Sequence, residues 1–245
     1  MEPSYLTTYN LLIFNTLDST NEEAKRLVRY GLPGNFVIIA DNQVAGRGQQ
    51  NKSWLSATGN LHMTLLIEMN KKLADNLNLV FLTANVLADT IESLNTSAKV
   101  KLKWPNDILI NNKKVAGILI ETIKINNKPY ILIGIGVNIK YAPDNVSFAA
   151  STLSNEIDYK EDSYSIFHEF MLNFDHEFKI WQEKENFSDI RQKWISRAYR
   201  LNKAITVGDG KSRISGLFKN IEIASNLTRS KTILQQLFIS NLDIY

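Results

Sequence analysis

A polar run expected to form a loop between two strands carries side chains suited to binding an anion. Residues 45–54 read AGRGQQNKSW. Its two glycines allow backbone conformations closed to other residues and can present N–H groups to an anion. Arg47 can pair bidentately with a carboxylate or a phosphate, and Trp54 offers a flat face for stacking. The run lacks the ending of a P-loop and the spacing of a dinucleotide-binding fingerprint. On its own it is also typical of an ordinary loop with a basic tip.

A second run places a carboxylate where a metal ion could bind. Residues 103–107 read KWPND, and the proline restricts the chain between two expected strands. Asp107 could hold Mg²⁺ beside triphosphate oxygens, because that ion favours a carboxylate combined with substrate phosphates. An Asn-Asp pair after proline is, however, more often simply a turn.

Two glycine-containing strands provide the remaining candidates. Residues 113–121 read KKVAGILIE, and residues 134–138 read GIGVN. A lysine at the mouth of a buried strand can reach a negative ligand. Lys114 suits this role better than Lys113, because Lys113 is sufficiently explained as an exposed residue of a solvated hairpin. Glycine weakens a strand unless a ligand or another backbone approaches closely, so the glycines in both runs indicate such an approach.

The elements that must position these side chains alternate between helices and strands. Ser19 or Thr20 is expected to cap a helix, with Glu22 or Glu23 completing a capping box, and Leu-Pro-Gly at 32–34 ends that helix. Apolar and β-branched runs predict strands at residues 36–40, 61–68, 100–104, 108–110, 115–123 and 130–139. Helical spacing predicts helices at residues 73–94, 163–182 and 187–197. Asn-Asn pairs at 111–112 and 126–127 are typical of hairpin turns. The order of elements indicates an α+β fold, a mixed β-sheet with packed helices.

Composition excludes several kinds of site. The 245 residues include three histidines and no cysteine. The absence of cysteine excludes disulfides, thiolate catalysis and cysteine-based zinc sites. The first ten residues lack the pattern of a signal peptide, and no apolar run approaches the ~20 residues that span a bilayer. We therefore expect a cytoplasmic protein without membrane contact.

Charge gives little reason to expect a nucleic-acid partner. The net charge of +3 is small. Residues 188–245 hold ten Lys and Arg against four Asp and Glu, and a solvated basic surface explains this excess better than a docking face for an acidic partner.

Five runs, in this order, resemble the motifs of the biotin protein ligase catalytic domain. That family shows S-T-N near the start of the domain, a G-R-G loop reaching a tryptophan, then K-W-P-N-D, K-x-x-G-I-L-x-E and G-x-G-x-N. The corresponding residues here are 19–21, 46–54, 103–107, 114–121 and 134–138. Each motif alone is unspecific, whereas five in sequence are specific.

The resemblance implies both a reaction and a domain layout. The reaction is that of a biotin–[acetyl-CoA-carboxylase] ligase: biotinyl-5′-AMP forms from biotin and ATP with Mg²⁺, and biotin passes to a lysine of a biotin carboxyl carrier domain. The layout is a class II aminoacyl-tRNA synthetase-like catalytic domain at residues 1–198, followed by a small SH3-like β-barrel at 199–245. Only 18 residues precede Ser19, so a winged helix-turn-helix and specific DNA binding are not expected. Monomer and homodimer both remain open.

The resemblance also assigns roles to individual residues. Arg47 and Lys114 become the catalytic cations, and Asp107 the ligand of Mg²⁺. The residues implied for biotin binding are Ser19, Thr20, Asn21, Gln43, Arg47, Gly48, Gln49, Lys114, Gly117, Gly134 and Gly136. Those implied for the nucleotide are Arg47, Trp54, Asn106, Lys114 and Asn138.

Some departures and alternatives accompany this interpretation. The loop in relatives commonly reads G-R-G-R-x-G, so Gln49 stands in place of a cation and Asn51 in place of a glycine. A lipoate protein ligase would share fold and chemistry, but the loop reaching tryptophan and K-W-P-N-D favour biotin. A non-catalytic biotin-binding protein is the other alternative, and the presence of both Arg47 and Lys114 argues against it.

Overall fold

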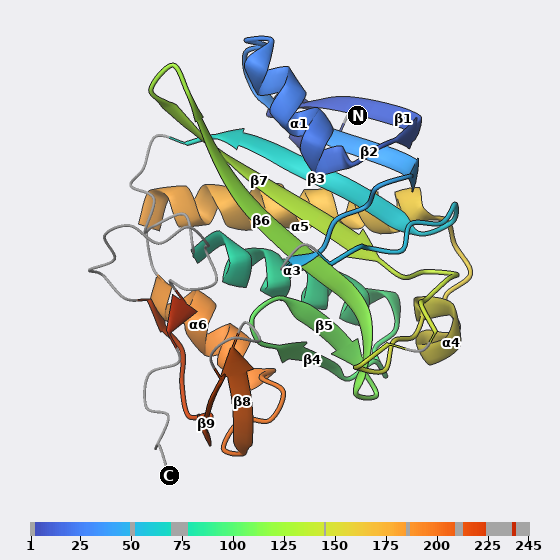
Figure 1. Ribbon diagram of the computed structural model, residues 1–245, viewed down its shortest axis with the longest axis vertical. Coiled ribbons are helices and arrows are strands. Elements are labelled where there is room, and N and C mark those ends of the chain that lie inside the picture. Colours follow the sequence, from blue (N-terminus) through green and yellow to red (C-terminus); the bar gives the residue numbers. More distant parts are fainter. Residues whose placement is uncertain are drawn as a thin grey trace.

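The centre of the computed structural model is a seven-stranded mixed sheet (Figure 1). The structure describes residues 3–49, 52–69, 78–144, 146–184, 187–208, 213–223 and 237–238. In spatial order the strands are β1 (Tyr9–Leu17), β2 (Asn35–Gln43), β3 (Leu61–Glu68), β7 (Lys128–Val137), β6 (Lys113–Ile125), β5 (Asp107–Ile110) and β4 (Val100–Lys103). Only β1 and β2 pair in parallel, and the other neighbours are antiparallel.

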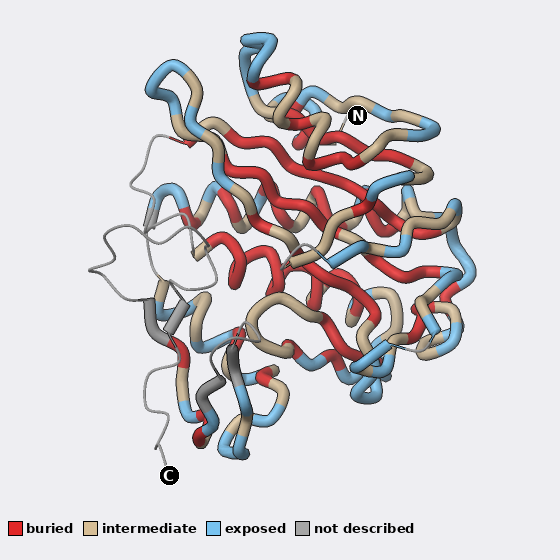
Figure 2. Tube along the Cα trace, in the orientation of Figure 1, coloured by how far each residue is buried: buried red, intermediate tan, exposed pale blue. Residues whose placement is uncertain are grey.

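The two faces of the sheet are covered very differently. Helices α3 (Asn78–Leu94), α5 (Ser163–Lys184) and α6 (Phe187–Ser196) lie on one face and form the large core with the inward side chains of the strands. On the other face, α1 (Thr20–Arg29) covers β2, β3 and one end of β7 over a small apolar cluster that includes Leu27, Ile38 and Leu66. Figure 2 shows most of β2, β3 and α3, and the middle of β6 and β7, as buried. Helix α1 therefore leaves the rest of this second face of the sheet uncovered.

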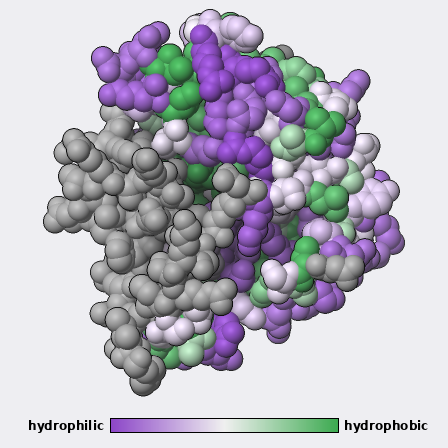
Figure 3. Space-filling view, in the orientation of Figure 1, coloured by the Kyte–Doolittle hydropathy of each residue, from purple (hydrophilic) through white to green (hydrophobic). Residues whose placement is uncertain are grey.

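Side-chain alternation assigns each strand residue to one of these faces. On β3, Leu65 and Ile67 join the large core, whereas Thr64 and Leu66 face α1. In Figure 3, hydrophilic side chains predominate around α1 and the tip of the β6–β7 hairpin, at the top of the view. The alternation of side chains along the strands also places the glycines of β6 and β7 on the face of the sheet where α1 lies.

Both predicted hairpin turns are confirmed. Asn111 and Asn112 have φ of 50° and 61°, and Asn126 and Asn127 have φ of 50° and 64°. Two successive residues with positive φ are the geometry of a two-residue turn that follows the twist of its strands, and asparagine tolerates it better than most residues. The strands predicted from residue 36 onward are confirmed, with small changes in their ends.

Some elements differ from expectation. Strand β1 and the short helix α4 (Leu153–Ile157) were not predicted. Ser19 is the N-cap of α1, but its side chain makes no capping hydrogen bond, and Glu23 pairs with Arg26 instead of completing a capping box. Residues 73–77 of the predicted helix at 73–94 lie outside the described residues, and Asn78–Leu94 are helical as predicted.

The C-terminal region is described only in part. Strands β8 (Ala204–Gly208) and β9 (Arg213–Leu217) form one antiparallel pair, and β10 (Glu222–Ile223) and β11 (Leu237–Phe238) another. Phe218 packs edge-on against Trp194 of α6, with ring centroids 6.4 Å apart. The SH3-like barrel and the boundary at residue 199 remain predictions. No helix in the described ranges is both long and apolar enough to cross a membrane.

Candidate active site

A cavity of about 770 Å³ opens on the sheet face that α1 leaves uncovered. This volume suits a small-molecule or cofactor site. Its walls come from the start of α1, the loop at 43–56, the turn at 103–107 and the segment at 143–150. All the residues predicted for the site line it: Ser19, Thr20, Asn21, Gln43, Arg47, Gly48, Gln49, Trp54, Asn106, Asp107, Lys114, Gly117, Gly134, Gly136 and Asn138. The structure thus brings together motifs up to about a hundred residues apart.

The floor of the cavity is formed by the backbone of glycines, which carry no side chains. Gly117 pairs with Gly136 across β6 and β7, so both face the same side of the sheet. A Cβ on Gly136 would lie 2.4 Å from Trp54 Cε2, and a Cβ on Gly134 would lie 2.4 Å from Asn21 Oδ1. The glycines were predicted to allow close approach of a ligand. They already allow close approach of two protein side chains, Trp54 and Asn21.

One end of the cavity is a network of neutral polar groups at the start of α1. Thr64 Oγ1 lies 2.6 Å from Asn21 Oδ1 and 2.8 Å from Thr20 Oγ1. Gln43 Oε1 accepts from the backbone N–H of Thr20 at 2.9 Å, and Gln43 Nε2 donates to Ser56 Oγ at 2.9 Å. These hydrogen bonds fix the orientation of Thr20, Asn21 and Ser56. Such a set of fixed donors and acceptors can recognise an uncharged polar head group.

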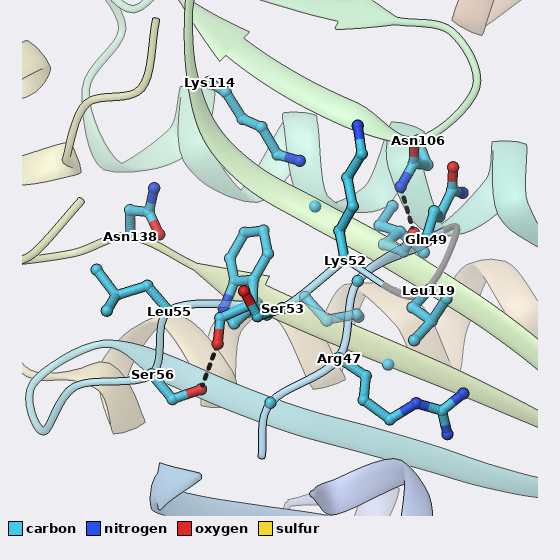
Figure 4. A pocket seen from close by; sticks show the side chains of 18 of the residues that line it. Arg47, Gln49, Lys52, Ser53, Leu55, Ser56, Asn106, Lys114, Leu119 and Asn138 are labelled. Carbon is cyan, nitrogen blue, oxygen red and sulfur yellow. Dashed lines mark hydrogen bonds between the residues drawn. The ribbon is translucent and has the colours of Figure 1, made fainter. Parts of the chain in front are cut away.

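The other end of the cavity is cationic. Lys114 Nζ lies 2.6 Å from Asp107 Oδ1 and 5.1 Å from the centre of the Trp54 ring. Lys103 Nζ lies 3.0 Å from Asp107 Oδ2. In Figure 4 the ammonium group of Lys114 points into the pocket, which Lys52 also lines. Phosphate or carboxylate oxygens would be stabilised at this end.

The two amides predicted for the nucleotide are engaged with backbone. Asn106 Nδ2 donates to Ile118 O at 2.7 Å, and Asn138 Nδ2 donates to Ser151 O at 3.3 Å. The backbone N–H and carbonyl of Lys114 bond to Ala149 and Ser151. These bonds fix the turn and the 149–151 segment on either side of the lysine.

Arg47 is positioned differently from Lys114. Its guanidinium pairs with Glu22 and lies 3.1 Å from Glu121 Oε1. Glu121 also accepts from Asn21 Nδ2 at 2.8 Å and from Lys25 Nζ at 3.0 Å. Burial by itself would raise the pKa of Glu121, but the hydrogen bond from Asn21 and the charge of Lys25 outweigh it, so the pKa lies below its ordinary value.

Asp107 does not fit the predicted magnesium site. Both of its oxygens are paired with ammonium groups, and two adjacent cations oppose the approach of a divalent ion. Within the described residues, no three His, Cys, Asp or Glu side chains cluster as metal ligands would. The role that the structure gives Asp107 is to hold Lys114 and Lys103.

Sequence reasoning missed Thr64 and Glu121. Thr64 was a polar residue inside an otherwise apolar strand, and that position was a usable signal, because buried hydroxyls need partners. Glu121 closes the K-x-x-G-I-L-x-E motif but was given no role. Asn51, noted as a departure in the loop, lies outside the described residues.

Comparisons with known proteins agree on one family. The model of the Biotin/lipoate A/B protein ligase family matches residues 13–138. A biotin--[acetyl-CoA-carboxylase] ligase from Paracoccus denitrificans is 32% identical over 211 residues, which is 84% of this chain and 88% of that protein. The bifunctional ligase/repressor BirA of Bacillus subtilis is 31% identical over 77% of this chain, and the match covers 59% of BirA. Among solved structures, biotin protein ligase from Aquifex aeolicus in complex with biotin and ATP superimposes with a TM-score of 0.72 at 26% identity, covering 87% of this chain and 88% of that one.

Proposed function

This chain belongs to the Biotin/lipoate A/B protein ligase family, and on that basis we propose that it is an ATP-dependent biotin protein ligase. It would form biotinyl-5′-AMP from biotin and ATP and pass biotin to a lysine of a biotin carboxyl carrier domain in the cytoplasm. The observation that carries the proposal is one pocket with a neutral polar end at Thr20 and Gln43, a glycine floor, and a cationic end at Lys114. An elongated ligand with an uncharged polar head and an anionic tail matches that order.

The polar end is proposed to bind the ureido ring of biotin. A ureido group has two N–H donors and one carbonyl acceptor, so it needs fixed partners of both kinds. Ser19, Thr20, Asn21 and Gln43 supply hydroxyl and amide groups there. Thr64 holds Thr20 and Asn21, and Ser56 holds Gln43. Gly134 and Gly136 would form the wall along the bicyclic ring and its chain.

The first chemical step brings two anions together. A carboxylate oxygen of biotin attacks the α-phosphorus of ATP, the bond to the bridging oxygen breaks, and pyrophosphate leaves. Cations must be in place before negative charge develops. Lys114 is positioned for this by its contact with Asp107, and Arg47 becomes the second cation if its side chain turns into the pocket. No step is assigned to Mg²⁺, because both carboxylate oxygens of Asp107 are already paired with lysines.

The second step needs no nucleophile from the enzyme. The uncharged amine of the acceptor lysine attacks the acyl carbon of the adenylate, an amide forms, and AMP leaves. The adenylate must be shielded from water in the interval. Trp54 lies over the floor where the adenylate would be, which suits that purpose.

Transfer of biotin to a purified carrier domain tests the proposal. The chain is incubated with biotin, ATP and the carrier domain, and intact-mass spectrometry follows the addition of one biotinyl group. We expect addition with ATP and none without it. A parallel reaction with lipoate distinguishes the two ligase types named by the family. Modification by lipoate alone would overturn the choice of biotin, and no modification by either would overturn the proposed function.

A further inference from the structure

The guanidinium of Arg47 is held by two carboxylates rather than reaching toward Lys114. It pairs with Glu22 of α1 and with Glu121 of β6, and in Figure 4 it points away from Lys114. The backbone at Arg47 and Gly48 is fixed independently, because Arg47 bridges to Ser53 and the N–H of Gly48 bonds to Lys52 O at 2.7 Å. The side chain alone must therefore move for Arg47 to contact a ligand.

We call the carboxylates of Glu22 and Glu121 the arginine dock. Lys25 contacts both of them, at 2.8 Å from Glu22 Oε1 and 3.0 Å from Glu121 Oε1. Two cations thus neutralise two carboxylates in the dock, and Lys25 remains if Arg47 leaves. The side chains of Arg47, Glu22 and Glu121 keep 34%, 30% and 20% of their surface exposed. Partly exposed pairs are weak enough for a competing phosphate or carboxylate to replace.

Glu121 has a second contact that Glu22 lacks. Its Oε2 accepts from Asn21 Nδ2 at 2.8 Å, so the amide oxygen of Asn21 turns toward Thr64. A carboxylate can only accept, and this fixes which end of the amide faces it. One side chain therefore contacts both the cation of the glycine-rich loop and the polar end of the pocket.

We propose that Glu121 is a positioning residue that, with Glu22, holds Arg47 out of the pocket until an anionic ligand competes for it, and that also orients Asn21. The ligand class in this proposal rests on the proposed function. The first test needs no ligand. Trypsin must take the guanidinium of Arg47 into its own pocket to cleave before Gly48, so a docked Arg47 is protected.

The variants are Glu22→Gln and Glu121→Gln, with Glu68→Gln as the matched control. Glu68 pairs with Lys128 at the end of β3 and does not line the pocket. We expect cleavage after Arg47, followed by mass spectrometry of the fragment that begins at Gly48, to quicken roughly three- to tenfold in both dock variants and to stay unchanged in the control. Unchanged cleavage in both dock variants overturns the proposal. If Glu121 variants do not fold, Glu22→Gln still decides it.

Calorimetry separates the two contacts of Glu121. In Glu22→Gln, ATP should bind more tightly because Arg47 is released, and biotin should bind at least as tightly as before because Asn21 keeps its partner. In Glu121→Ala, biotin should bind more weakly, because the amide of Asn21 is no longer held. Equal loss of both ligands in both variants would indicate a merely structural role and overturn the proposal. If the unaltered protein binds neither ligand, the proposed function fails, while the cleavage result still decides whether the dock holds Arg47.

Discussion

The indole ring of Trp54 lies directly on the backbone of Gly136. A Cβ at position 136 would come within 2.4 Å of Trp54 Cε2, a separation that real Cβ atoms do not show. Within the described part of the chain, the buried Nε1 of Trp54 has no hydrogen-bond partner. The indole is therefore held by contact with the glycine floor, and any ligand that lies along this floor must share it with Trp54 or displace it.

Gly136→Ala should destabilise the protein because the new methyl group and Trp54 cannot both keep their places. Overpacking of this kind costs about 1–3 kcal/mol in free energy of unfolding. Thermal denaturation measures it, and adding Trp54→Ala should recover most of the loss. Gly48→Ala is the control, since its Cβ would meet nothing closer than 3.4 Å. An equal loss in the presence and absence of Trp54 would show that the contact is not the cause.

Lys114→Ala should stop adenylate formation while the fold survives. The cation at the anionic end of the pocket is lost, and removal of one such group costs roughly 10²–10³-fold in rate. Release of pyrophosphate in the presence of biotin and ATP is the measurement. The neighbouring Lys113→Ala serves as control, because Lys113 pairs with Glu156 and does not line the pocket. Near-normal pyrophosphate release by Lys114→Ala would remove this lysine from the mechanism.

Thr64→Val should weaken biotin binding although no residue at the pocket surface changes shape. The substitution removes a buried hydroxyl that lies within hydrogen-bond distance of Thr20 and Asn21, and about 1–3 kcal/mol of stability is expected to go with it. Thr83→Val is a matched control. Thr83 is equally buried, and among the described residues its hydroxyl has no partner. Calorimetric titration with biotin should distinguish the two variants, and identical affinities would exclude a role for Thr64.

The stability of the protein should fall as the pH drops below about 6.5, in part because of His62. Burial lowers the pKa of His62 below its ordinary 6.5, although the carbonyl of Ala40 opposes this. The unfolded chain therefore takes up a proton first, and stability present above pH 6.5 is lost toward the folded pKa, at up to about 1.4 kcal/mol per pH unit. Glu121 loses its contribution only below its ordinary 4.5. Urea unfolding at several pH values between 7 and 5 measures the free energy of unfolding. This free energy should fall less steeply with decreasing pH in His62→Gln than in the unaltered protein, and an equal pH dependence would contradict the assignment.

Local signals explain what could be predicted from the sequence. Strand β3 was found from its apolar run, and the β6–β7 hairpin from its strands and the Asn126-Asn127 turn, because each signal lies within the element itself. Strand β1 lacks such a signal. It is an edge strand with an irregular burial pattern, Ile13 is half exposed, and its partner β2 is reached only through α1. Helix α4 is five residues long, too short for a periodic pattern.

The site was predicted from motifs, but its internal contacts were not. The resemblance gathered Ser19 to Asn138 into one pocket, as the structure does. It could not reveal that Arg47 is docked on Glu121, since these residues are 74 positions apart and the pairing depends on how α1 sits on the sheet. Charge pairs between distant elements follow from packing, which the order of residue types does not encode locally. The salt bridges of Asp107 with two lysines, which argue against a metal ion there, were hidden from the sequence for the same reason.

The two-residue turn at Asn126 and Asn127 lies at the far end of the hairpin from the pocket, yet it decides which side chains line that pocket. It fixes Ile125 opposite Lys128, and from there Gly117 opposite Gly136. A slip of one residue between the two strands would turn the side chains of β7 to the opposite face and bring Ile135 to the floor in place of a glycine. In this hairpin, then, loop length is as strict a requirement as residue identity, and a change that touches no ligand could close the binding site entirely.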